Sequence, residues 1–272
     1  MSMAQARSAP LRLLVIGNSH AAAPRMAYTV EPDRWPDCQI DFLAVRGGNI
    51  IKFELRGTVL HPTDARTTEE MQKFNRVKQL DLAPYDRIAL VGGFGWPNMA
   101  GMFDSHRCVD FPSVIAGDQD GQLIGRQLLD LALQVRVRRG FSVRLMRVLQ
   151  PLGKPMLLMP EPLPSGECNL DPDGYGDYLM MAARGDAGHC RRLLMRAAHA
   201  VLGDQAALPF WPEAAVQDDA FTAPHLMRGS ARLSADGIAV HPASDFAHGN
   251  VEYGGLLLDR IVAGFDPQPA TL

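Results

Sequence analysis

The chain has 272 residues, of which 47% are hydrophobic and 21% charged, as is usual for a globular protein with a sizeable core. Its formal net charge is -3, so it lacks the general excess of basic residues with which proteins neutralise the phosphates of nucleic acids or of anionic membranes. We therefore expect no nucleic-acid partner.

The first apolar run, residues 11–16, is short and is followed directly by Gly17. It lacks the apolar core and cleavage site of a signal peptide, and no later run reaches the roughly 18 apolar residues of a membrane span. These features predict a cytoplasmic protein without a membrane span. The cysteines, at positions 38, 108, 168 and 190, form no CxxC pair, so we expect isolated, mostly buried thiols and no metal or other cofactor.

Short apolar runs bounded by turn residues predict strands that are buried on both faces. They cover residues 11–16, 40–45, 87–91, 155–159 and 207–211. Helical spacing covers residues 122–149, with a break near Gly140, then residues 187–202 and 250–263. This alternation predicts an α/β fold with a parallel sheet of about five strands and helices on both faces.

No repeat or flexible linker divides the chain, so we expect a single domain over residues 1–272. Residues 51–84 fit this pattern less well, because FELRGTVLHP predicts a hairpin and TTEEMQKF a helix capped by Thr67 or Thr68. We interpret this segment as an insertion or a flap. Ligands of such sheets bind beyond the carboxyl ends of the strands, which directs attention to the residues that follow each apolar run.

The first run ends in LRLLVIGNSHAAAP, where Gly17, Asn18 and Ser19 form a predicted tight turn that exposes a hydroxyl. A serine after a strand is more often a helix N-cap than a nucleophile. The GxSxG elbow of α/β-hydrolases is not satisfied, because Ala21 stands at the position of its second glycine. The turn alone is therefore weak support for a nucleophile.

A second pattern stands near the C-terminus, in VHPASDFAHGNVEYGG. Asp245 precedes His248 by three residues, so the carboxylate can hydrogen-bond the imidazole Nδ1 and leave Nε2 to accept a serine proton. His241 extends the pattern to HxxxDxxH, which could alternatively ligate a metal ion, and Asp236 with His241 is an alternative acid–histidine pair. We favour Asp245 and His248, since a metal site would normally need a further ligand and would leave GNSH without a task.

Together, GNS after the first strand and DxxHxNxxYG before the last helix resemble the SGNH (GDSL-like) hydrolase superfamily. The resemblance spans nearly the whole chain. It implies a flavodoxin-like three-layer α/β/α fold and a serine esterase that cleaves carboxylic esters through an acyl-enzyme. By this resemblance Ser19 is the nucleophile, His248 the general base and Asp245 its orienting carboxylate. Tyr253 and Gly254, which open the final helix, are interpreted as structural support.

The family's second block supplies a glycine N–H to the oxyanion hole, and LAVRGGNI offers Gly48 beside Gly47. We expect the N–H groups of Gly48 and Ser19 to face the developing oxyanion, a role in which one donor is worth about 2.7–4 kcal/mol. The alternative is that both glycines only form a turn with positive φ.

The third block departs from the family. Its usual asparagine is replaced by Phe94 in YDRIALVGGFGWPNMAG, and a phenyl ring cannot donate a hydrogen bond. A backbone N–H of Gly93 or Gly95, or the side chain of Asn98, is expected to replace that donor.

The candidate substrate pocket consists of His20, Phe94 and Trp96, although His20 could instead cap its turn and the large apolar residues could belong to the core. The expected substrate is a small-molecule or glycan ester, such as a short acyl or sugar O-acetyl ester. The same triad would serve an acyltransferase, and the missing amide donor is also compatible with a non-catalytic carbohydrate-binding protein. The sequence does not predict an oligomeric state.

Overall fold

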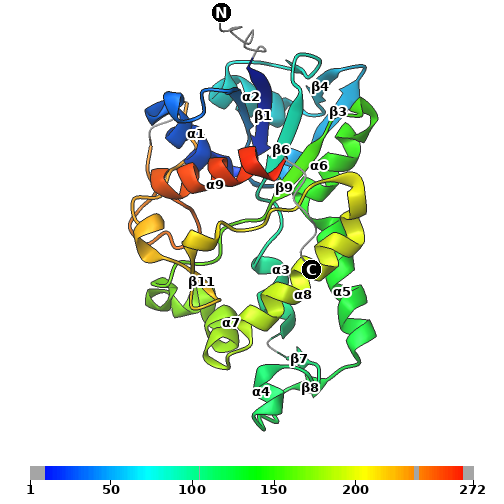
Figure 1. Ribbon diagram of the computed structural model, residues 1–272, viewed down its shortest axis with the longest axis vertical. Coiled ribbons are helices and arrows are strands. Elements are labelled where there is room, and N and C mark those ends of the chain that lie inside the picture. The colour runs from blue at the N-terminus through cyan, green and yellow to red at the C-terminus, as the bar shows by residue number, and fades with distance from the viewer. Residues whose placement is uncertain (1–9, 104, 236–238, 266–272) are drawn as a thin grey trace, which may run out of the picture.

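The computed structural model describes residues 10–103, 105–235 and 239–265. Its centre is a four-stranded parallel sheet with strand order β2-β1-β6-β9 (Figure 1). The strands are β1 (Leu11–Gly17), β2 (Cys38–Ala44), β6 (Arg87–Val91) and β9 (Met156–Met159). Because the strands are parallel, their carboxyl ends meet at one edge, where ligands of such sheets bind.

The strands are nearly continuous runs of buried apolar side chains, as strands covered on both faces require. In β1, Leu14 and Ile16 belong to the larger core cluster, whereas Leu13 and Val15 belong to a second cluster on the opposite face. The register places Gly17 beside Ala44 of β2 and Val91 of β6. These three strands therefore end at the same level, and the loops that follow them begin side by side.

Helices cover both faces of the sheet. Helices α1 (Ala22–Val30) and α9 (Val251–Gly264) lie side by side and pack on the face of the smaller cluster (Figure 1). Helix α6 (Phe141–Leu149) contributes Val143, Leu145 and Met146 to the cluster on the other face. The chain is thus a mixed α/β protein with a parallel sheet, as the sequence predicts.

The predicted strand at residues 207–211 is wrong. Only Ala207 pairs with the sheet, through its N–H to the Met156 carbonyl at 2.9 Å and its carbonyl to the Leu158 N–H at 2.9 Å. Pro209 lacks an N–H and cannot continue such a ladder, and Phe210 adopts a positive φ of 55°. The sheet therefore has four strands instead of about five.

Residues 51–84 form a small unit beside the main sheet. The predicted hairpin is confirmed as β3 (Phe53–Arg56) and β4 (Val59–Pro62), which pair antiparallel, with β5 (Leu80–Asp81) alongside. The predicted helix is α2 (Ala65–Asn75), but its cap is Asp64 instead of Thr67 or Thr68. The Asp64 carboxylate accepts the Thr67 N–H at 2.7 Å, which satisfies a donor that the helix leaves unpaired.

The predicted helical segment 122–149 is divided at Gly140, as expected, but it begins later. Residues 122–123 form the short strand β8 (Gln122–Leu123), and α5 (Arg126–Arg139) then leads to α6. Helix α8 (Ala187–Leu202) has the predicted bounds. The remaining elements include α3 (Pro97–Phe103), β7 (His106–Arg107), α4 (Pro112–Ile115), α7 (Pro172–Ala183), β10 (Val216–Gln217) and β11 (Phe221–Thr222).

Among the residues that the structure describes, no helix combines the length and the apolar character needed to cross a membrane. The prediction of mostly buried thiols is confirmed, because Cys108, Cys168 and Cys190 are buried and only Cys38 is partly exposed.

Candidate active site

Ser19 stands at the carboxyl end of the central strand β1. It opens a short 3-10 turn, η1 (Ser19–Ala21), which continues into α1. The cap of this turn is Asn18 and not the serine, because the Asn18 Oδ1 accepts the His20 N–H at 3.1 Å. The serine hydroxyl is thus left for other partners, and the alternative reading of Ser19 as an N-cap is not supported.

A close approach of two strands forms the base of this turn. A Cβ on Gly17 would lie 2.7 Å from the Val91 carbonyl oxygen and 2.8 Å from the Ala21 Cβ. Only glycine fits there without movement of β6 or of the turn. Gly17 therefore lets the serine turn pack directly against the end of β6.

Asp245 and His248 share a tight turn immediately before α9. The Asp245 Oδ1 accepts the backbone N–H groups of Ala247 at 3.0 Å and His248 at 2.9 Å, so the carboxylate organises the turn that carries the histidine. The chain then enters α9 through Asn250, whose side chain accepts the N–H groups of Glu252 and Tyr253.

The three side chains that the sequence singles out meet at this edge of the sheet. The His248 Nε2 lies 2.9 Å from the Ser19 Oγ, and the His248 Nδ1 lies 2.9 Å from the Asp245 Oδ2. A carboxylate can only accept hydrogen bonds, so the proton resides on Nδ1 and Nε2 is free to accept the serine proton. This is the geometry that a serine nucleophile with a histidine base requires.

The charge of the carboxylate is stabilised by its partners. Burial by itself raises the pKa of Asp245, but the side-chain hydrogen bond and charge of His248, together with the two backbone N–H groups, lower this pKa well below its ordinary value. Asp245 is therefore ionised throughout the neutral range and can hold His248 in the tautomer described above.

His248 lies between two other imidazole rings, a feature that the sequence analysis did not anticipate. The ring of His20 is stacked on it at 4.5 Å, and the ring of His241 at 4.3 Å on the other side. Burial, then the neighbouring His248, lowers the pKa of His20 well below its ordinary value, and the same two causes lower the pKa of His241. Both outer rings are thus neutral at neutral pH.

The alternative hypothesis, a metal site, concerns the residues of the HxxxDxxH pattern. One ligand atom each from His241, Asp245 and His248 lie within 4.8 Å of one another. However, the two imidazole planes are only 14° from parallel at 4.3 Å. Since a metal ion binds an imidazole nitrogen in the plane of its ring, one ion between stacked rings could not be in the plane of both, and one ring would have to rotate. The arrangement favours the hydrogen-bonded triad.

The two glycines of the second block follow β2, whose last residue, Ala44, pairs with Gly17. Gly47 and Gly48 open the 3-10 turn η3 (Gly47–Ile51), and the first amides of such a turn have no helical acceptor. Gly47 has a positive φ of 50°, whereas Gly48 does not. The need for a glycine at a position of positive φ therefore explains only Gly47. Gly48 remains the predicted donor.

In the loop after β6, one of the three candidate donors is already occupied. The Gly93 N–H is already used, since it donates to the Glu161 Oε1 at 3.1 Å. A Cβ on Gly95 would lie 3.1 Å from the Glu161 Cβ, so this glycine allows the loop to pack closely on residue 161. The backbone of Asn98 belongs to α3, and its side chain lies outside the described part of the structure.

Glu161 is the site residue that the sequence analysis missed. It follows β9, the fourth strand to end at this edge, and its carboxylate lies 3.8 Å from the His20 Nε2. Burial raises the pKa of Glu161, opposed by the Gly93 N–H, the charge of His248 and the Asn18 side chain. The available signal was its position in PMLLMPEP, two residues beyond a predicted strand.

Comparison of the chain with protein-family models and with curated proteins gave no match. The site is therefore interpreted from its own geometry.

The predicted pocket residues have different environments. The Phe94 side chain is 1% exposed and packs in the larger core cluster, which agrees with the alternative that this residue belongs to the core. Trp96 is partly buried and stacks on Tyr175 at 5.2 Å. His20 contacts His248 and Glu161 directly. Asp236, the alternative acidic partner of His241, lies outside the described residues. The His241 Nδ1 itself lies 3.1 Å from the Asp245 Oδ2, so His241 and His248 share the same carboxylate.

Proposed function

We propose that this chain is a serine hydrolase that cleaves a carboxylic ester through an acyl-enzyme. The observation that carries the proposal is the continuous contact from Asp245 through His248 to the Ser19 Oγ, with 2.9 Å at each step. Ser19 and His248 are separated by 229 positions in the chain, so their contact is not a consequence of local sequence.

In this mechanism the Ser19 Oγ attacks the ester carbonyl carbon while its proton moves to the His248 Nε2. Collapse of the tetrahedral intermediate breaks the ester C–O bond, and His248 returns the proton to the leaving alcohol. Water then attacks the acyl-enzyme with His248 again as base, which releases the acid and regenerates Ser19. Asp245 stabilises the imidazolium in both steps, and the N–H groups of Ser19 and Gly48 bind the oxyanion.

The same proposal includes membership of the SGNH superfamily with a flavodoxin-like three-layer fold. It is supported by the parallel strand order, the helices on both faces, and the order of the serine turn, the glycine turn and the DxxH turn along the chain. The substrate class we propose is a short acyl or sugar O-acetyl ester. The protein is proposed to act in the cytoplasm.

The test is covalent labelling with a fluorophosphonate, which an activated serine attacks at phosphorus as it would a carbonyl carbon. We expect one adduct, located by peptide mapping on the segment that contains GNSH, and no adduct with Ser19→Ala. Asn18 precedes the serine on the same turn but is not proposed to react. An adduct at another serine in the folded protein, or no adduct at all, would contradict the proposal.

Chelation of metal ions distinguishes this mechanism from the alternative hypothesis of a metal site. Hydrolysis of a nitrophenyl ester is expected to persist in EDTA, because the triad needs no ion. Activity that disappears in EDTA and returns with zinc or manganese would instead favour a metal bound by His241, Asp245 and His248.

A further inference from the structure

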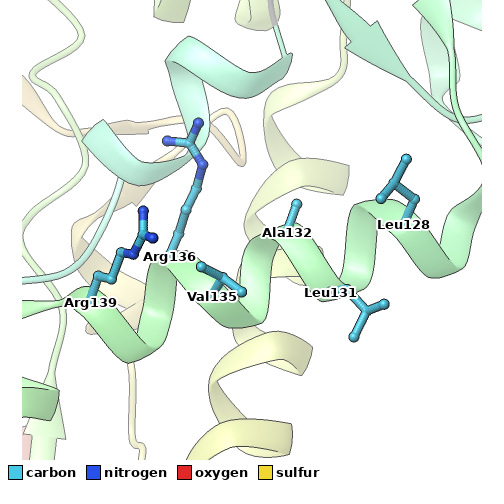
Figure 2. A pocket seen from close by; sticks show the side chains of 6 residues that line it. All are labelled: Leu128, Leu131, Ala132, Val135, Arg136 and Arg139. Atoms are coloured by element: carbon cyan, nitrogen blue, oxygen red, sulfur yellow. The ribbon is translucent and has the colours of Figure 1, made fainter.

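A pocket of about 240 Å³ opens where the last turn of α2 faces two loops. Its lining comes from three segments of the chain: Arg46 after β2, Lys73 and Phe74 in α2, and residues 232–235 with Ala239. The hollow in Figure 2 is different, because six residues of α5 alone line it and four of them are apolar. A ligand in the α2 pocket, which we call the basic pocket, would instead meet charged and apolar groups from several segments, as in other small-molecule sites.

Three cations line the basic pocket, and one carboxylate accompanies them. Glu70 accepts hydrogen bonds from the Arg46 N–H at 2.8 Å and from the Arg46 Nε at 3.2 Å, which leaves both terminal nitrogens of this guanidinium for another acceptor. Lys73 and Arg232 form no ion pair with any residue that the structure describes. In a chain whose formal net charge is -3, this local excess of positive charge attracts an anion.

The aromatic ring of Phe74 gathers two of these cations. Phe74 is 2% exposed, and its ring centroid lies 5.4 Å from the Arg46 Cζ and 5.5 Å from the Lys73 Nζ. Each contact with the ring is favourable, but the two positive charges are kept near one another and repel. A bound anion would offset this repulsion, since the described structure pairs only one of the two with a carboxylate.

On one side, the basic pocket adjoins the serine turn. The Asn75 side chain bonds both the N–H and the carbonyl of Ala44 at 2.8 Å, which fixes the end of α2 at the carboxyl end of β2. Ala44 in turn pairs with Gly17, the residue from which the serine turn departs. Phe74 also shares an apolar cluster with Ala21, the last residue of that turn.

On the other side, the basic pocket adjoins the histidine stack. The Arg232 N–H donates to the Ala239 carbonyl at 2.7 Å, and the His241 N–H donates to the Ser230 carbonyl at 2.9 Å, so the two short segments pair antiparallel. Burial and then His248 lower the pKa of His241, and the charge of Arg232 adds to this effect while Asp245 opposes it. The pocket therefore lies beside the proposed triad, where a substituent of a substrate bound at Ser19 can enter it.

We propose that the basic pocket binds an anionic group, a carboxylate or a phosphate, on the alcohol part of the ester substrate. The planar guanidinium groups of Arg46 and Arg232 match the paired oxygens of such anions, and Lys73 adds a point charge. The volume is below the range of about 300–1,000 Å³ of pockets that hold a whole ligand, so it suits one substituent. The inference rests on the proposed hydrolase function, whose short acyl group leaves the alcohol part to carry the charge.

Calorimetric titration of the full chain tests the pocket without reference to hydrolysis. The probes are phenyl phosphate and benzoate, with benzyl alcohol as their neutral counterpart. We expect saturable binding of at least one anion and none of benzyl alcohol, and the tighter anion identifies the preferred group. Arg232→Gln and Lys73→Gln should each raise the Kd at least about tenfold, the effect of losing a hydrogen bond to a charged group.

The matched control is Arg147→Gln, which removes an arginine from the last turn of α6 and should bind the anions like the wild type. Absence of anion binding, equal binding of benzyl alcohol, or unchanged binding by both pocket variants would overturn the proposal.

Kinetics on a matched pair of esters separates the pocket from the hydrolase activity. The pair is nitrophenyl acetate and its analogue with a carboxylate on the ring. We expect the ratio of kcat/KM for the charged ester to that for the neutral ester to fall at least about tenfold in Arg232→Gln and to be unchanged in Arg147→Gln. If both esters are hydrolysed and Arg232→Gln leaves the ratio unchanged, the role of the pocket is overturned while the hydrolase stands. If neither ester is hydrolysed by a chain that binds the anions, the hydrolase proposal fails, and with it the assignment of the anion to an ester.

Discussion

At the residue scale, the geometry of the proposed triad depends on very few atoms. One oxygen of Asp245 lies close to two imidazoles, because the His241 Nδ1 lies 3.1 Å and the His248 Nδ1 2.9 Å from the same Oδ2, and the contact with His248 is a hydrogen bond. Only His248 also reaches the Ser19 Oγ. The two histidines of the HxxxDxxH pattern therefore have different expected roles, although they flank the same aspartate in the sequence.

We predict that Asp245→Asn lowers kcat by about 10,000-fold with a modest change in KM, because an asparagine favours the wrong imidazole tautomer. Steady-state kinetics on a nitrophenyl ester measures both constants. Asp236→Asn serves as the control and should change neither. His241→Ala should lower kcat far less than His248→Ala, and equal losses in folded proteins would show that the active pair has been wrongly assigned.

Glu161 is expected to act as a positioning residue for the loop after β6. Its carboxylate holds the Gly93 N–H and approaches His20, so truncation releases two parts of the site at once. We predict that Glu161→Ala lowers kcat by roughly 100-fold, the cost of a misplacement of about 1 Å, with a smaller change in KM.

Asn98→Ala should lower kcat by less than the roughly 100-fold that loss of a direct oxyanion donor causes.

Both variants require thermal melts, since a collapsed loop would imitate a catalytic loss. If Asn98→Ala has the larger effect in a folded protein, Asn98 is the missing donor and Glu161 has only a structural role.

At the scale of elements, the site depends on how closely β1 and β6 approach. We predict that Gly17→Ala destabilises the fold by about 1–3 kcal/mol, the usual cost of overpacking, because the new methyl group would meet the Val91 carbonyl at 2.7 Å. Urea unfolding measures this difference. Gly101→Ala in α3 is the matched control, since no atom lies within 4 Å of its added Cβ.

Gly101→Ala should stabilise the protein by about 0.5–1 kcal/mol, because alanine loses less backbone entropy in a helix than glycine does. Equal effects of the two substitutions would indicate that the strand–turn contact at Gly17 is not tight in solution.

At the scale of the whole molecule, the partly buried histidine stack is expected to make stability depend on pH. The pKa of His20 in the folded chain is lowered well below its ordinary value of 6.5, first by burial and then by the charge of His248. His241 acts in the same direction, whereas Asp245 opposes it. As the pH falls, the unfolded chain therefore gains a proton at His20 before the folded chain does. The free energy of unfolding is thus unaffected by His20 above about pH 6.5 and decreases progressively below it.

We predict that the Tm of the wild type falls more between pH 7.5 and pH 5 than the Tm of His20→Gln, which has no proton to gain at this position. Differential scanning calorimetry at matched ionic strength measures both. His225→Gln is the control, because its side chain is 63% exposed. Parallel pH profiles for the wild type and His20→Gln would contradict the burial of His20.

The sequence by itself predicted the elements whose signals are local. Four of the five predicted strands, the break at Gly140 and the bounds of α8 are confirmed, because buried parallel strands and helix termini have characteristic patterns. It also selected Ser19, Asp245 and His248 from among the polar residues, through their positions after a strand and before a helix.

Tertiary structure alone decided how these residues meet and which others join them. The stacking of His20 and His241 on His248, and the approach of Glu161 to His20, bring together residues from three separate segments of the chain. No pattern within one segment encodes such contacts, because they arise from strand order and register. The lost fifth strand is a different case, because Pro209 lies within the predicted run itself and prevents the pairing that an apolar run otherwise favours.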